Sequence, residues 1–74
     1  MAQLDNVISP GIELGQRIKI LRKTAGLTQQ QVADALGVSR PAIAFWETGR
    51  EGSARKHIPK LAALLHVEPE VFLT

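Results

Sequence analysis

TQQQVADALGVSRPAIAFWE, from Thr28 to Glu47, carries the signals of two short helices separated by a tight turn. Thr28 is a residue type that caps helix starts, and Gln31 three places later completes a capping box, which predicts a helix beginning near Gln29. The apolar residues that follow share one helical face: Val32, Ala33 and Leu36. Gly37 comes next, and glycine readily adopts the left-handed conformation that ends a helix.

A second helix is predicted from Arg40 to Thr48. Ser39 offers another cap, and Pro41 in the first turn costs little because the earliest amide groups of a helix have no partner within it. Helical spacing turns one group of side chains inward, namely Ala42, Ile43 and Trp46, and another group outward, namely Arg40, Pro41, Ala44 and Phe45. Two helices joined by a short, glycine-containing turn form a helix-turn-helix arrangement.

The segment TQQQVADALGVSRPAIAFWETGR resembles the helix-turn-helix of lambdoid phage repressors and Cro proteins, the Cro/CI-type or xenobiotic-response-element (XRE) family. GQRIKILRKTAGL, from Gly15 to Leu27, resembles the first helix of that family, and PKLAALLHVEPEVFL, from Pro59 to Leu73, resembles its closing helices. The resemblance covers roughly residues 12–73. It implies an all-α fold, a compact bundle of about five short helices like the lambda repressor DNA-binding domain.

The chain has 74 residues and no cysteine. A chain of this length buries only about 60% of its unfolded surface, which favours one small core of helices packed at short range. We expect a flexible arm over residues 1–9 and one helix-turn-helix domain over residues 10–74. Cysteine ligands are lacking, and His57 and His66 lack the paired spacing of a metal site, so no metal, cofactor or small-molecule ligand is expected.

Charge is unevenly distributed along the chain. All nine Lys and Arg residues lie within residues 17–60, which hold only three of the seven acidic residues and so carry a net charge of +6. A fold that brings this segment to one face is suited to a polyanion. The longest apolar stretches are far shorter than the about 18 residues that a membrane span requires. The N-terminus also lacks the basic start of a signal peptide, so a cytoplasmic protein is expected.

A first helix is predicted before the motif, beginning at Ser9 and Pro10 and ended by Gly26. Its apolar stripe consists of Leu14, Ile18, Leu21 and Ala25. Ile20 falls outside this stripe, and two interpretations stay open: an isolated exposed side chain, or part of a contact surface.

The family resemblance implies a partly buried salt bridge between Arg22 and Glu47. This pair would tie the first helix to the second motif helix and would be structural rather than a DNA contact. Glu47→Ala should therefore cost more than a surface change, because it strands a charge.

After a loop over residues 48–53, the next helix begins either at Ser53 or near Ile58 with Pro59 in its first turn. Its buried face consists of Leu61, Ala62, Leu64 and Leu65. His66 is expected in a partly exposed turn.

A last short helix is predicted to start at Glu68 and Pro69 and to complete the core. In the resembling family this helix and its surroundings often form the dimer contact. Surplus apolar surface on its last residues is therefore the candidate dimer interface: Val71, Phe72 and Leu73.

The resemblance also implies which residues read DNA bases, namely Ser39, Arg40, Pro41, Ala44 and Phe45. Arg40 can span O6 and N7 of guanine, although a phosphate contact or a solvated charge is the other interpretation. Pro41 and Phe45 have no side-chain donor, so the hydrogen bonds made by polar relatives do not transfer to them. Phe45 either presses on a thymine methyl group, or shields the core edge or meets another protein.

The candidate phosphate-binding residues are Gln29, Arg50, Arg55 and Lys56. Gln29 stands at a helix N-terminus, where amide groups attract phosphate, and the resemblance implies that a Gln here contacts the DNA backbone and braces the reading helix. A simple surface residue is the other interpretation. One such domain covers few base pairs. Two copies with reading helices about 34 Å apart would match a two-fold operator, so we expect a homodimer at least on DNA.

These patterns predict a sequence-specific regulator that binds double-stranded DNA, most simply a repressor. An activator or a controller protein of a restriction system is equally compatible. The alternative class is a protein-interaction module of the same fold, such as an antitoxin or a coactivator-like bridging factor. An enzyme is not expected, because the sequence shows no nucleophile beside a base, no carboxylate pair and no glycine-rich phosphate loop.

Overall fold

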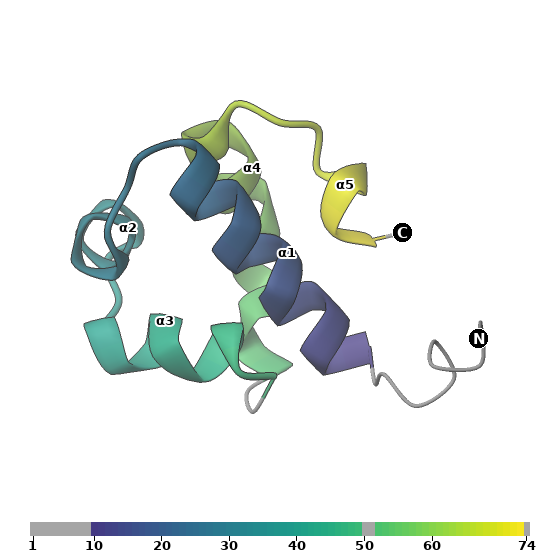
Figure 1. Ribbon diagram of the computed structural model, residues 1–74, viewed down its shortest axis with the longest axis horizontal. Helices are drawn as coiled ribbons and strands as arrows, with labels where there is room; N and C mark the ends of the chain where they lie inside the picture. The colour runs from purple at the N-terminus through teal and green to yellow at the C-terminus, as the bar shows by residue number, and fades with distance from the viewer. Residues whose placement is uncertain (1–9, 50–51, 74) are drawn as a thin grey trace.

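The computed structural model describes residues 10–49 and 52–73, and within these ranges it is entirely helical. The elements, in chain order, are α1 Pro10–Thr24, α2 Gln29–Leu36, α3 Arg40–Glu47, the 3-10 helix η2 Gly52–His57, α4 Ile58–Leu65 and α5 Glu70–Leu73. Figure 1 shows α1 running diagonally across the bundle, with α3 near its N-terminal end and α5 beside it. The predicted all-α bundle of about five short helices is confirmed. The predicted N-terminal arm over residues 1–9 lies outside the described residues.

The start and end of α2 follow the local signals of the sequence. The Gln31 amide donates to Thr28 Oγ1 at 3.0 Å, and the Thr28 amide donates to Gln31 Oε1 at 2.8 Å. This is the predicted capping box. Gly37 ends the helix with a φ of 74°, in the left-handed region that favours glycine.

The start of α3 also follows its predicted cap. Ser39 Oγ accepts from the Ala42 amide at 3.3 Å, and Pro41 lies in the first turn. The helix ends at Glu47, one residue earlier than predicted, because Thr48 caps it. The Thr48 amide bonds to Ala44 O, and its hydroxyl donates to Phe45 O at 2.9 Å.

The core lies where α1, α2, α3 and α4 meet. Its largest fully buried side chains are Ile18, Val32, Ile43, Trp46 and Leu61. One predicted member is wrong: Ala25 is exposed, because α1 ends at Thr24 and Ala25 already belongs to the turn.

Gly15 lies at a close contact between α1 and α3. A Cβ atom built on Gly15 would stand 2.1 Å from the Trp46 carbonyl oxygen and 2.9 Å from that of Glu47. Real Cβ atoms do not approach backbone oxygens this closely, so only glycine permits this separation of the two helices.

The helix after the loop begins at Ile58 with Pro59 in its first turn, which is the second of the two alternatives left by the sequence. Residues 52–57 form η2 instead of extending this helix. Helix α5 begins at Glu70, after a turn in which the Val71 amide donates to Glu68 O at 3.0 Å. None of the helices in the described ranges is long and apolar enough to cross a membrane.

His66 ends α4 in the left-handed region, with φ 59° and ψ 43°, and its exposed position in a turn is as predicted. Non-glycine residues pay about 1 kcal/mol for this conformation. His66→Gly should therefore raise the free energy of unfolding by about 0.5–1 kcal/mol and the melting temperature by several degrees.

Thermal denaturation followed by circular dichroism measures this effect. Ala63→Gly is the matched control, because Ala63 is exposed in the interior of the same helix. There glycine should destabilise by about 1 kcal/mol. Equal losses in both variants would show that the His66 backbone is not strained.

Candidate nucleic-acid interface

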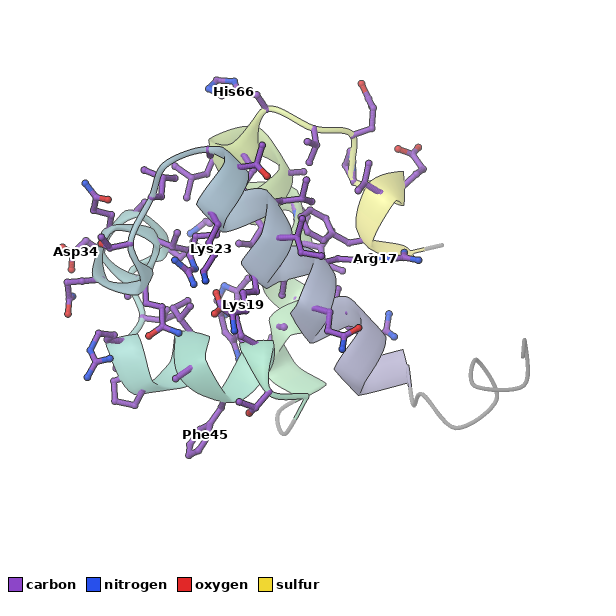
Figure 2. All side chains as sticks on the ribbon, in the orientation of Figure 1. Arg17, Lys19, Lys23, Asp34, Phe45 and His66 are labelled. Carbon is purple, nitrogen blue, oxygen red and sulfur yellow. The ribbon has the colours of Figure 1, made fainter. Side chains whose placement is uncertain are left out.

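The outward face of α3 carries the five residues predicted to read bases. Four of them are exposed, namely Ser39, Arg40, Pro41 and Phe45, and Ala44 is half-buried. Figure 2 shows Phe45 projecting from α3 away from the rest of the molecule. The opposite face of the same helix buries Ile43 and Trp46 in the core. The buried face therefore packs α3 against the core, and the opposite face is exposed to solvent.

Arg22 on α1 and Glu47 at the end of α3 form a bidentate ion pair. Arg22 Nε lies 2.6 Å from Glu47 Oε2, and Arg22 Nη2 lies 3.0 Å from Oε1. Arg22 Nη1 also donates to Leu27 O at 2.9 Å. Both residues are buried, 7% and 8% exposed. A pair this well satisfied holds α3 to α1, although its desolvation offsets much of the attraction.

The ion pair stabilises the charge of Arg22 in the interior. The hydrogen bond to Glu47 raises the pKa of the Arg22 guanidinium above its ordinary value, burial opposes the shift, and the negative charge of Glu47 adds to it. Among the described residues, no buried side-chain nitrogen or oxygen lacks a hydrogen-bond partner. The charged groups of Arg22 and Glu47 are therefore buried with their hydrogen-bonding atoms satisfied.

A chain of hydrogen bonds connects this ion pair to the exposed face. Gln29 Nε2, at the start of α2, donates to Glu47 Oε1 at 3.0 Å. The other end of the same amide, Gln29 Oε1, accepts from Arg40 Nη1 at 3.4 Å. Glu47 thus fixes which end of the Gln29 amide faces Arg40. The resemblance implied that Gln29 braces the reading helix, but the sequence did not identify Glu47 as its partner, because the two residues are 18 positions apart on different helices.

Two of the predicted phosphate-binding residues, Arg55 and Lys56, are exposed on η2. Their helix is joined to α3 by a stacked ring pair, in which the Trp46 and His57 centroids are 5.1 Å apart with an interplanar angle of 28°. No pattern in the sequence predicted this pairing. Arg50 lies outside the described residues.

A second surface lies between α1 and α5, where four residues line an open apolar hollow of about 370 Å³: Arg17, Ile20, Leu21 and Val71. Ile20 is 63% exposed and Val71 is 38% exposed. Arg17 Nη1 donates to Val71 O at 2.9 Å and so connects the two helices. Of the two interpretations of Ile20, the contact surface is the one that this hollow favours.

The predicted dimer residues of α5 divide between surface and core. Val71 borders the hollow, whereas Phe72 is only 3% exposed and belongs to the core, because α5 folds back onto α1. Phe72 therefore offers no surplus apolar surface, and the side chain of Leu73 lies outside the described residues. Across those residues, no group of three or more His, Cys, Asp or Glu could hold a metal ion.

Comparisons with known proteins agree with this architecture. A crystal structure of the restriction-modification controller protein C.AhdI from Aeromonas hydrophila is similar, with a TM-score of 0.75 and 33% sequence identity. The match covers 82% of this chain and 92% of that one.

A curated relative from Bacillus subtilis (strain 168), the SPbeta prophage-derived uncharacterized HTH-type transcriptional regulator YonR, is 34% identical over 59 residues. The match covers 80% of this chain and 55% of the relative, so the chain spans about half the length of the curated relative it matches. The sequence model of the family described as "Helix-turn-helix domain" matches residues 13–72, which include α2, α3 and the residues that connect them to the core. The chain belongs to this helix-turn-helix domain family.

Proposed function

We propose that this protein is a sequence-specific, double-stranded-DNA-binding transcriptional regulator that inserts α3 into the major groove. The observation that carries the proposal is the hydrogen-bonded chain that ends at Arg40. Gln29 accepts a hydrogen bond from Nη1 of the Arg40 guanidinium, which leaves Nε and Nη2 to bond O6 and N7 of guanine in the groove. Ser39, Pro41, Ala44 and Phe45 surround it on the same exposed helix. The proposal also places the protein in the cytoplasm, beside its DNA.

Phosphate contacts on both sides of α3 would set the register of the complex. On one side Gln29 stands at the N-terminus of α2, where a second amide hydrogen remains after its bond to Glu47. On the other side Arg55 and Lys56 lie on η2, and Arg50 precedes them in the chain. These contacts would supply affinity, while α3 supplies the choice of sequence.

The protein would bind as a homodimer through the hollow between α1 and α5. Ile20 and Val71 leave apolar surface exposed there, on a different part of the molecule from Phe45. A two-fold contact would present two α3 helices to successive major grooves, about 34 Å apart.

Repression is the simplest regulatory outcome, since a bound dimer occludes a promoter. The similarity to a restriction-modification controller protein supports a controller role as the second form of the same proposal. A protein-interaction module is the alternative class, favoured by the exposure of Phe45.

Selection from random-sequence duplex DNA at two salt concentrations tests the function. The expected result is an enriched two-fold sequence whose affinity falls steeply with salt, because several phosphates are neutralised. No enrichment even at low salt, together with recovery of a specific protein partner, would instead support the interaction module.

Lys56→Ala should weaken binding by a similar factor for every DNA sequence and reduce the slope of log K against log salt by roughly one unit. The reason is that a phosphate contact carries no sequence information. Fluorescence anisotropy on the selected site and on a scrambled duplex measures both effects. Lys60→Ala, an exposed lysine on α4, is the matched control for total charge. A change in the preferred DNA sequence would show that Lys56 contacts bases rather than phosphate.

Ile20→Asp should convert the dimer to a monomer, because it places a charge in the apolar hollow. The fold should tolerate the change, since Ile20 is 63% exposed. Sedimentation velocity measures the oligomeric state. Ala63→Asp puts the same charge on an exposed site of α4 outside the hollow and should leave the dimer intact. Identical sedimentation of the two variants and the wild type would exclude this interface.

A further inference from the structure

We infer that Phe45, with Pro41 and Ala44, forms an apolar strip that reads the C5-methyl group of thymine beside the guanine read by Arg40. The inference rests on the proposed function and specifies what the apolar residues among the five predicted base readers recognise. Phe45 is one of three large apolar side chains that are exposed among the described residues. The other two, Ile20 and Val71, border one hollow, whereas Phe45 stands apart on α3.

The strip is continuous along α3. Pro41 and Phe45 are four residues apart, which places them on the same face of the helix one turn from each other, and Ala44 lies between them. None of the three side chains has a hydrogen-bond donor or acceptor. The only carboxylate of α3, Glu47, is buried in its ion pair, so the strip can approach a polyanion without repulsion.

An apolar strip in the major groove discriminates between bases because it leaves the hydrogen-bonding groups of the wrong bases without partners. Each base pair presents donors and acceptors there, and the thymine methyl is the one apolar group among the four bases. Pressing Phe45 against the exposed amino group of cytosine or adenine would remove water from a polar group without replacing its hydrogen bond. The strip therefore favours thymine both by burying its methyl group and by excluding the other bases.

The helix geometry sets the distance between the two readings. Arg40 and Phe45 are five residues apart in α3, which corresponds to about 7.5 Å along the helix axis. Successive base pairs are about 3.4 Å apart, so each half-site should contain a guanine and a thymine about two base pairs from each other.

Uracil substitution isolates the methyl group, because uracil differs from thymine only at C5 and leaves all hydrogen-bonding groups unchanged. Duplexes of the selected site, each with one thymine position replaced by uracil in both half-sites, are titrated by fluorescence anisotropy. For the wild type, one position should lose about fourfold in affinity per methyl group removed, or about 15-fold when both half-sites are changed. The other thymine positions should show no loss.

Phe45→Ala should weaken binding to the thymine duplex and abolish the difference between thymine and uracil at that position. Phe45→Leu, which keeps an apolar side chain, should retain most of the difference. Arg40→Ala should lose the preference for guanine and keep the uracil effect. Phe45 is 53% exposed, so these variants should fold, and circular dichroism checks this.

The outcomes separate the inference from the proposed function. A selected sequence that is insensitive to uracil at every position, or a uracil effect that persists in Phe45→Ala, overturns the inference and leaves the DNA-binding function standing. Failure to select any sequence overturns both. Unchanged DNA binding by Phe45→Ala assigns the side chain to a protein contact and also overturns the inference.

Discussion

Glu47→Ala is expected to lower the free energy of unfolding by about 3–5 kcal/mol, which is a large part of the stability of a domain this small. The substitution leaves the Arg22 guanidinium buried without its carboxylate, and the remaining bond to Leu27 O satisfies only one of its donors. It also removes the acceptor that fixes the Gln29 amide. Urea denaturation measures the loss. Gln30→Ala, an exposed change on α2, is the control and should cost well under 1 kcal/mol.

A double variant separates the two roles of Glu47. Replacing both partners, as in Arg22→Met with Glu47→Leu, removes the stranded charge and should recover most of the stability. DNA discrimination should not recover, because Gln29 then has no acceptor that turns its oxygen toward Arg40. A double variant that selects guanine as strongly as the wild type would show that Glu47 acts only in folding.

Gly15→Ala is expected to destabilise the protein by about 2–3 kcal/mol, despite the better helix propensity of alanine. The new Cβ atom would stand 2.1 Å from the Trp46 carbonyl oxygen, and neither partner is a flexible side chain that can move aside. Helices α1 and α3 must separate, which loosens the core around Trp46 and displaces α3. The melting temperature should fall by roughly 10 °C or more.

Gln16→Ala is the matched control, since Gln16 is the next residue of α1 and is exposed. It should leave the melting temperature within a few degrees of the wild type. A fully stable Gly15→Ala variant would mean that the two helices are less closely packed than the structure has them. DNA binding, measured below the melting transition, should weaken in Gly15→Ala and remain unchanged in Gln16→Ala.

The local elements were predictable because short-range chemistry determines them. The capping box of Thr28 and Gln31, the left-handed Gly37 and the cap at Ser39 each depend on residues within a few positions. Helical spacing likewise assigned Ile43 and Trp46 to the core. The start of α4 was left open, because Ser53 and Pro59 offer equally good local signals. In the structure α4 begins at Ile58.

The salt bridge beside the candidate site was predictable in its residues, whereas the hydrogen bonds and stacking around it were not. Family resemblance implied the pair of Arg22 and Glu47, which the structure contains. The bond from Gln29 to Glu47 and the stacking of Trp46 on His57 join residues on different helices, and no periodicity encodes such contacts. The sequence assigned the last helix both to the core and to the dimer surface, and it could not divide these roles, because it does not reveal how far α5 folds back. In the structure Phe72 is buried and Val71 is exposed.

The contact at Gly15 has a mechanical consequence for the proposed dimer. In that dimer, helix α1 would carry Ile20 on its partner-facing side, and at Gly15 it meets the end of α3 backbone to backbone, where no side chain of α1 can absorb a displacement. A rotation of one protomer against the other therefore moves α3 by the same rigid-body displacement. The distance between the two reading helices, and with it the operator spacing the dimer accepts, is then set by the angle at which two copies of α1 meet.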